Sequence, residues 1–97
     1  MQRSYESVVV IDSSLGDQDI EQEIEKITSF VSEGQGEVTE VQRWGRRKIA
    51  YEISGKSEGY YTLLRFAAGP ELIEGLERAF RLNESVLRHL VLRVSGE

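Results

Sequence analysis

The sequence predicts an α+β fold in which a four-stranded antiparallel sheet carries two helices on one face. The 97 residues suffice for a single domain, because domains take roughly 100 to 150 residues each. The hydrophobic pattern changes in the order strand, helix, strand, strand, helix, strand. Two strand-helix-strand units in this order interleave through right-handed crossovers. Both helices then cover one face of the sheet, and the open face is where we expect a binding function.

The first strand and the first helix have the clearest patterns. Residues Tyr5–Ile11 are rich in β-branched side chains and apolar on both faces, which predicts a central strand. Asp12–Ser14 supplies capping chemistry, and a helix is predicted over about 17–33, ended by the glycines of 34–36. Its acids lie in the first half, at the positive end of the helix dipole. Its apolar stripe is Ile20, Ile24, Ile27 and Val31.

The second and third strands are predicted as an antiparallel hairpin. Glu37–Ile53 has strand composition, but its alternation changes phase along the way. Ile49, Tyr51 and Ile53 share the parity of Val41, whereas Val38 and Trp44 have the other parity. A long, bent strand with a bulge at Gly45 accounts for this change. The turn 54–59 is short, so the strand from Tyr60 to Ala67 pairs antiparallel with it.

The second helix opens at Gly69-Pro70-Glu71, with proline in the first turn, and ends near Asn83. Its predicted buried stripe is Leu72, Leu76, Ala79 and Phe80. The last strand is predicted over Val86–Val94 and is followed by a frayed tail at 95–97. In this strand Leu90, Leu92 and Val94 alternate with His89 and Arg93.

The composition argues against an enzyme. The absence of cysteine excludes disulfides, thiolate nucleophiles and thiolate metal sites, and His89 is the single histidine, so we expect no metal and no cofactor. Acid pairs such as Asp17 and Asp19 lie on an exposed helical turn, where nothing would separate their pKa values. The glycines of 34–36 do not form a phosphate-binding loop. His89 is interpreted as a surface or partner-facing side chain.

The charge is segregated along the chain. The net charge of −5 argues on average against nucleic acid as a partner. However, six acids and no base lie between Asp12 and Glu25, whereas four bases lie within 43–48. The first apolar run, Val8–Ile11, is too short for a signal peptide core or a membrane span. We therefore expect a cytoplasmic protein with no membrane partner.

The basic segment around Trp44 is the most informative part of the chain. In an extended strand Trp44, Arg46 and Lys48 point to the same side, so that an aromatic plane is flanked by two cations. This pattern is typical of nucleic-acid binding. The alternative is a solvated edge strand whose charges prevent pairing with a neighbour. The tryptophan favours a binding role, provided that the indole and the cations do not pack on the chain's own helices or pair with its own acids.

The aromatic third strand invites comparison with RNA recognition motifs, which share the topology. The match is imperfect. Glu58 stands where that motif has a base, Tyr61 where it has a small residue, and Thr62 where it has a stacking aromatic. Base stacking on the open sheet is therefore not favoured. The side chains assigned to the core instead are Tyr60, Leu64 and Phe66.

Four segments together resemble a known family over nearly the whole chain: Arg3–Glu6, Trp44–Ile53, Gly59–Tyr61 and Leu82–His89. The chain is similar to bacterial small-subunit ribosomal protein six. The resemblance implies a ferredoxin-like domain over residues 1–97 and a structural role in the small ribosomal subunit. It also implies binding to the central domain of small-subunit ribosomal RNA, together with small-subunit ribosomal protein eighteen, a small basic protein. Arg46, Arg47 and Tyr51 match the family pattern and are carried over as interaction residues.

The resulting hypothesis is a non-catalytic RNA-binding protein of the ribosome, monomeric when free. The residues expected to contact RNA are Arg3, Trp44, Arg46, Arg47 and Lys48. Those expected to contact the protein partner are Tyr51, Arg88 and His89. The alternative is a small-molecule-binding regulatory domain of the same topology, dimerised across the open sheet. A small phosphatase would need an arginine and an asparagine at the first loop, and residues 12–16 offer neither.

Overall fold

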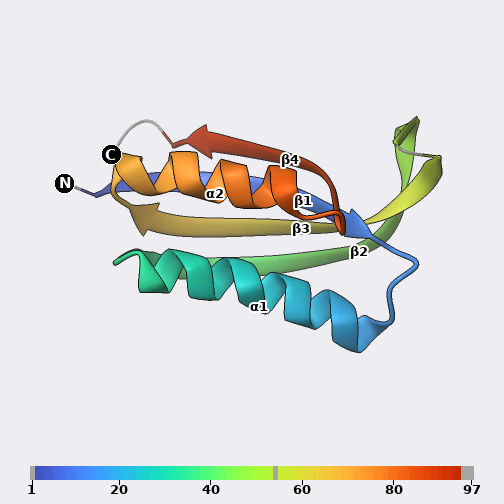
Figure 1. Cartoon of the computed structure of the whole chain (residues 1–97), viewed down its shortest axis with the longest axis horizontal. Coiled ribbons are helices and arrows are strands. Elements are labelled where there is room, and N and C mark those ends of the chain that lie inside the picture. The colour runs from blue at the N-terminus through green and yellow to red at the C-terminus, as the bar shows by residue number, and fades with distance from the viewer. Residues whose placement is uncertain (1, 54, 95–97) are drawn as a thin grey trace.

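The computed structural model describes residues 2–53 and 55–94 and confirms the predicted order of elements (Figure 1). The tail at 95–97 and Ser54 of the predicted turn lie outside the described residues. The strands form one antiparallel sheet in the order β2-β3-β1-β4, with β1 central as predicted. The elements are β1 (Arg3–Asp12), α1 (Asp17–Glu33), β2 (Glu37–Ile53), β3 (Lys56–Ala68), α2 (Pro70–Leu82) and β4 (Val86–Arg93).

The helix boundaries agree with the sequence prediction, but the first cap does not. Gly16 is the N-cap residue of α1 and makes no side-chain capping bond. The Asp12 carboxylate instead accepts hydrogen bonds from the backbone N–H and the hydroxyl of Ser14, at 3.0 and 2.8 Å, and so orders the β1–α1 loop. At the other end, the Gly34 N–H donates to the Phe30 carbonyl at 3.1 Å, and Gln35 takes a φ of 70°.

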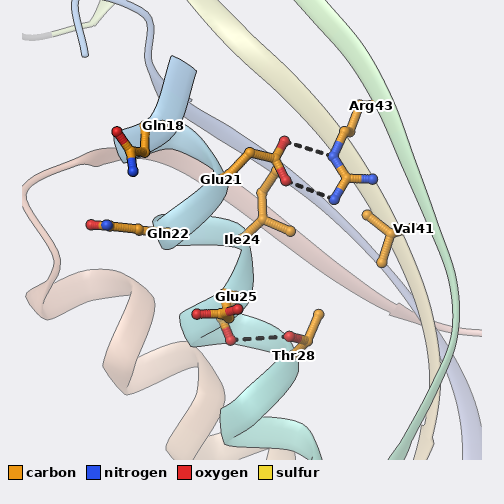
Figure 2. A pocket seen from close by; sticks show the side chains of 8 residues that line it. All are labelled: Gln18, Glu21, Gln22, Ile24, Glu25, Thr28, Val41 and Arg43. Atoms are coloured by element: carbon orange, nitrogen blue, oxygen red, sulfur yellow. Dashed lines mark hydrogen bonds and ion pairs between the residues drawn. The ribbon is translucent and has the colours of Figure 1, made fainter. Parts of the chain in front are cut away.

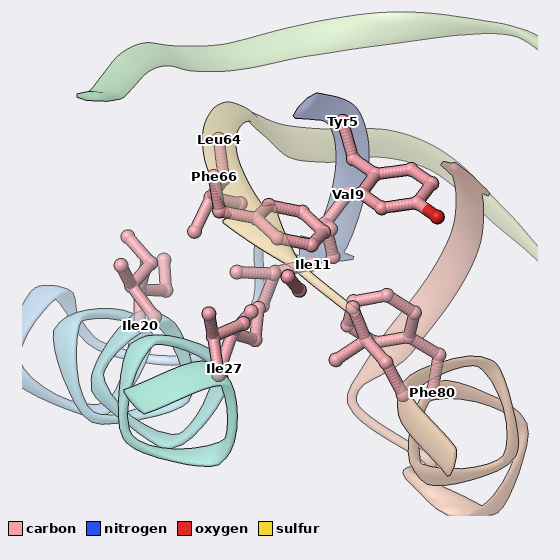
Figure 3. Packing of buried hydrophobic residues seen from close by; sticks show 12 residues of the cluster. Tyr5, Val9, Ile11, Ile20, Ile27, Leu64, Phe66 and Phe80 are labelled. Carbon is pink, nitrogen blue, oxygen red and sulfur yellow. The ribbon is translucent and has the colours of Figure 1, made fainter. Parts of the chain in front are cut away.

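The core lies between the sheet and the two helices, which share one side of it (Figure 3). Phe66 of β3 is 2% exposed, and its ring stacks on Tyr5 of β1 with 5.7 Å between centroids. Leu64 and Phe66 are core residues as predicted, and Tyr60 is partly buried and packs against the core cluster. The buried cluster is Tyr5, Val9, Ile11, Ile20, Ile24, Ile27, Val31, Leu64, Phe66, Ala68, Leu76 and Phe80.

The opposite face of the sheet is open. Side chains alternate along a strand, so the neighbours of the core residues Val9 and Leu64 point away from the helices. Arg65 at the middle of this face bonds Glu6 of β1 at 2.8 Å and Glu40 of β2 at 2.7 Å, linking three strands. The open face also carries Val8, Val10, Tyr61, Leu63, Arg88, Leu90 and Leu92.

The β2–β3 hairpin extends past the end of the sheet (Figure 1). The last residue of β1, Asp12, pairs with Gly59, and Gly59 pairs with Arg47. Beyond this row, residues 48–53 and 55–58 therefore form a two-stranded arm, which we call the distal hairpin. β3 begins at Lys56 rather than at the predicted Tyr60, so the turn is shorter than the sequence indicated. Gly59 leaves room for the side chains of Val10 and Ile49, which meet at the base of this arm.

Neither α1 nor α2, the helices of the described residues, has the length and hydropathy needed to cross a bilayer.

Candidate nucleic-acid interface

A β-bulge divides the basic segment into two sides. The pairing register shifts between Arg43 and Gly45, and Gly45 has a φ of 88°, which confirms the predicted bulge. Arg46 pairs with Tyr60 on the helix side of the sheet, whereas Trp44 lies with Arg47 on the open-face side. The prediction that Trp44 shares one side with Arg46 and Lys48 is therefore wrong, because the extra residue resets the alternation. Lys48 pairs with Glu58 and so lies on the same side of β2 as Arg46.

Trp44 and Arg47 form a stacked pair. The Arg47 guanidinium carbon lies 5.6 Å from the centroid of the indole ring, and its Nε donates to the Trp44 carbonyl at 3.3 Å. The indole N–H donates to the Gln42 side chain at 2.9 Å, and Trp44 is 39% exposed. Within residues 2–53 and 55–94, no carboxylate forms an ion pair with Arg47 or Lys48. These two cations and the indole remain accessible to an anionic partner.

Arg46 is occupied inside the molecule. It donates from Nε to the Ser13 carbonyl at 3.2 Å and from Nη2 to the Leu15 carbonyl at 3.1 Å. Its Nη1 lies 2.9 Å from the Asp17 carboxylate. The condition that no cation of the basic segment 43–48 pairs with the chain's own acids is thus met by Arg47 and Lys48 but not by Arg46, nor by Arg43, which pairs with Glu21.

Arg3 lies far from the basic segment 43–48. It pairs with Ala68 at the start of β1, whereas Arg47 of the basic segment lies level with Asp12 at the other end of that strand. Nine strand steps separate the two ends, about 30 Å. The Arg3 Nε is buried without a hydrogen-bond partner. An RNA contact at Arg3 would therefore belong to a separate part of the surface.

A groove of about 310 Å³ runs between α1 and β2 (Figure 2). Among the described residues, Arg43 is the one cation that lines it, and it makes two hydrogen bonds to the Glu21 carboxylate, at 2.7 and 2.8 Å. The bonds from Arg43 hold the pKa of Glu21 below its ordinary value. The groove thus presents no free positive charge to a phosphate. Its lining is Gln18, Glu21, Gln22, Ile24, Glu25, Thr28, Val41 and Arg43.

Three carboxylates that accept hydrogen bonds in the folded protein predict how the free energy of unfolding depends on pH. Hydrogen bonds from Ser14 lower the pKa of Asp12, and those from Gln42 and Arg65 lower the pKa of Glu40, as Arg43 does for Glu21. A carboxyl whose pKa is lower in the folded state stabilises the fold above its unfolded pKa and loses that contribution as the pH falls through the folded pKa. We expect the free energy of unfolding, measured in urea, to fall as the pH drops below about 4.5.

In Glu21→Gln the free energy of unfolding should fall less steeply with decreasing pH, because the substitution removes one of the titrating groups. An unfolding free energy that rises on acidification from pH 4.5 to pH 3 would contradict the assignment of these three carboxyls.

The residues predicted to contact a protein partner lie in two places. Tyr51 is 76% exposed on the distal hairpin, and Arg88 is exposed on the open face of β4. His89 faces the helices instead, with its ring 5.0 Å from that of Phe80. The interpretation of His89 as a surface-facing side chain is therefore wrong, because the parity of β4 turns it inward.

Sequence reasoning missed the apolar part of the open face. Leu90 and Leu92 are 51% and 52% exposed there, beside a hollow of about 230 Å³ whose lining includes Val8, Val10 and Tyr61. Parity in β4 gave the opposite signal, because Leu90, Leu92 and Val94 alternate with His89 and Arg93, which favours burial of the leucines. Among residues 2–53 and 55–94, no three His, Asp or Glu side chains are grouped so that they could hold a metal ion.

Comparisons with known proteins agree with this geometry. The family model for ribosomal protein S6 matches residues 4–93. The small ribosomal subunit protein bS6 of Clostridium beijerinckii is 42% identical over 90 residues, which cover 93% of this chain and 95% of that protein. That of Caldanaerobacter subterraneus subsp. tengcongensis is 41% identical over 91 residues, covering 94% and 96%.

The solved structures agree as well. The crystal structure of 30S ribosomal protein S6 from Thermotoga maritima superposes with a TM-score of 0.91 at 29% identity, covering 97% of this chain and 89% of that one. The family model, the identity to relatives over nearly the full length and the close structural match give one assignment: the chain belongs to the ribosomal protein S6 family.

Proposed function

We propose that this chain is a structural constituent of the small ribosomal subunit that binds the central domain of its RNA together with small-subunit ribosomal protein eighteen. Its membership of a ribosomal family supports the general role. The observation that carries the RNA contact is the stacked pair of the exposed Trp44 indole and Arg47, with Lys48 as a second exposed cation on the other side of the same strand. Neither cation forms an ion pair with a carboxylate of the described residues.

The chemistry of this surface suits a phosphate backbone. The planar Arg47 guanidinium offers a fork of donors that matches phosphate geometry, and stacking on Trp44 restricts its rotamers before RNA arrives. Lys48 adds a mobile point charge. Trp44 offers part of its ring to a sugar or a base. Positive charge is thus concentrated locally in an acidic protein.

The open face suits a protein partner. Leu90, Leu92 and the hollow beside Val8 form an exposed apolar area with Arg88 at its margin. An apolar centre with a polar rim is typical of protein interfaces. A basic partner such as protein eighteen would also offset the net charge of −5 in the RNA complex. The free chain would then be a cytoplasmic monomer whose open face is covered on assembly.

The test compares two double variants of equal charge. Arg47→Gln with Lys48→Gln removes the proposed contacts, whereas Arg78→Gln with Arg81→Gln removes two exposed cations from α2, on the other side of the sheet. Affinity for the central-domain RNA fragment is measured against salt with protein eighteen bound. We expect the first variant to reduce the salt slope by about 0.7 to 0.9 for each lost contact. The second should leave the slope unchanged.

An unchanged slope for the first variant would remove this surface from the RNA site. The alternative function is a regulatory domain that holds a small molecule across a homodimer. The observation that favours it is the hollow on the open face. It predicts a stable homodimer by sedimentation, a melting temperature that depends on the metabolite, and no RNA affinity with protein eighteen present.

A further inference from the structure

We infer that Arg46 is a positioning residue: it fastens the β1–α1 loop to the base of the distal hairpin and so fixes the direction in which Arg47, Lys48 and Tyr51 are presented. This inference rests on the proposed function, because it assigns to two adjacent arginines two different roles in the same interface.

The contacts of Arg46 converge on one loop. Its Nε, Nη2 and Nη1 each have a partner between residues 13 and 17: two backbone carbonyls and the Asp17 carboxylate, all within 3.2 Å. The guanidinium carbon also lies 5.9 Å from the centroid of the Tyr60 ring. Its donors are thus directed at the protein itself, which leaves Arg46 poorly placed to bind a phosphate as Arg47 could.

The same loop is tied to the other strand of the hairpin. The Ser13 hydroxyl donates to the Glu58 carbonyl at 3.3 Å and to the Glu58 carboxylate at 3.1 Å. Lys56 lies 3.5 Å from the Asp12 carboxylate. The loop therefore contacts β2 through Arg46 and β3 through Glu58 and Lys56, at the level where β1 ends.

Beyond that level the sheet no longer supports the hairpin. In the ladder Lys48 pairs only with Glu58 and Ile53 only with Lys56, and an isolated two-stranded hairpin is marginally stable in water. A tie at the base therefore has a large effect on where the arm points. The conformational entropy of the arm is then lost when the free protein folds, so RNA binding does not have to order the arm.

Arginine is required at this position by geometry. Its planar fork can reach two carbonyls and a carboxylate at once, whereas a lysine ammonium is a single point charge. The Arg46→Lys variant keeps the charge but loses the fork, so it separates positioning from electrostatics.

The experiment uses the matched single variants Arg46→Gln and Arg47→Gln, which make the same charge change at adjacent positions. Salt dependence of RNA affinity is measured with protein eighteen bound. We expect Arg47→Gln to reduce the slope by about 0.7 to 0.9. We expect Arg46→Gln to keep the wild-type slope while weakening binding about tenfold at every salt concentration, and Arg46→Lys to do the same.

A second readout does not involve RNA. Amide hydrogen exchange over 47–58 in the free protein should become faster in Arg46→Gln and Arg46→Lys and stay unchanged in Arg47→Gln. If Arg46→Gln does not fold by circular dichroism, Arg46→Lys decides both measurements. A reduced slope in Arg46→Gln with unchanged exchange would make Arg46 a phosphate contact and overturn the inference. If the wild-type complex does not bind RNA, the proposed function fails, and the exchange experiment still decides whether Arg46 orders the arm.

Discussion

Replacing Phe66 by alanine is expected to lower the free energy of unfolding by about 3 to 5 kcal/mol. Phe66 is 2% exposed, lies on β3 between β1 and β2, and stacks on Tyr5. Its removal costs the transfer free energy of the ring and leaves a cavity where the sheet meets the helices. Urea unfolding followed by circular dichroism measures the change. The melting temperature should fall by more than about 12 °C, since each kcal/mol corresponds to about 4 to 8 °C in a domain of this size.

Phe66→Leu is the matched control, because it keeps most of the apolar volume. We expect it to cost about 1 to 1.5 kcal/mol. A loss below 1 kcal/mol for Phe66→Ala would mean that the ring is not packed in solution as it is in Figure 3.

The second large effect is expected for Leu76→Ala on α2, at about 2 to 5 kcal/mol. Leu76 is 1% exposed and belongs to the buried cluster through which this helix contacts the rest of the core. The truncation leaves space that a rigid helix cannot close. The free energy of unfolding in urea is again the measurement.

The same helix offers a control with the identical chemical change. Leu82 is 73% exposed at the end of α2, so Leu82→Ala should change the unfolding free energy by no more than about 0.5 kcal/mol. Equal losses at the two positions would show that helix propensity, and not burial, determines the stability of α2.

The elements of this fold could be predicted because their signals are local. The spacing of Ile20, Ile24, Ile27 and Val31 specifies a helix over 17–33, and Pro70 marks the start of the second helix. β1 is central because it is apolar on both faces. These patterns involve only neighbouring residues, so tertiary contacts did not alter them.

The division of the basic segment could be predicted only in part. The change of phase near Trp44 revealed the bulge at Gly45, but the directions of Trp44 and Arg46 depend on which residue is unpaired, and that depends on β3. The acids that pair with Arg43 and Arg46 lie on α1, more than twenty residues away in sequence. The hydrophobic alternation within β2 does not reveal contacts between residues so far apart in the sequence.

The orientation of β4 illustrates a different limit. Val91 and His89 face the helices, while Leu90 and Leu92 face outward, although hydrophobicity alone favours the opposite arrangement. Its register with β1, in which His89 lies opposite Val9, determines the choice. A strand that presents two leucines outward, beside Arg88, suits a surface that becomes covered on assembly.

The central place of β1 has a consequence for synthesis of the chain. Its partners are residues 59–68 and 86–93, which are synthesised after it, so β1 cannot pair until these later segments have been made. At about 5 to 20 residues per second, this strand emerges several seconds before its neighbours exist. During that interval the apolar segment Val8–Ile11 has no strand partner, and a nascent chain is exposed to aggregation there until β4 has been synthesised.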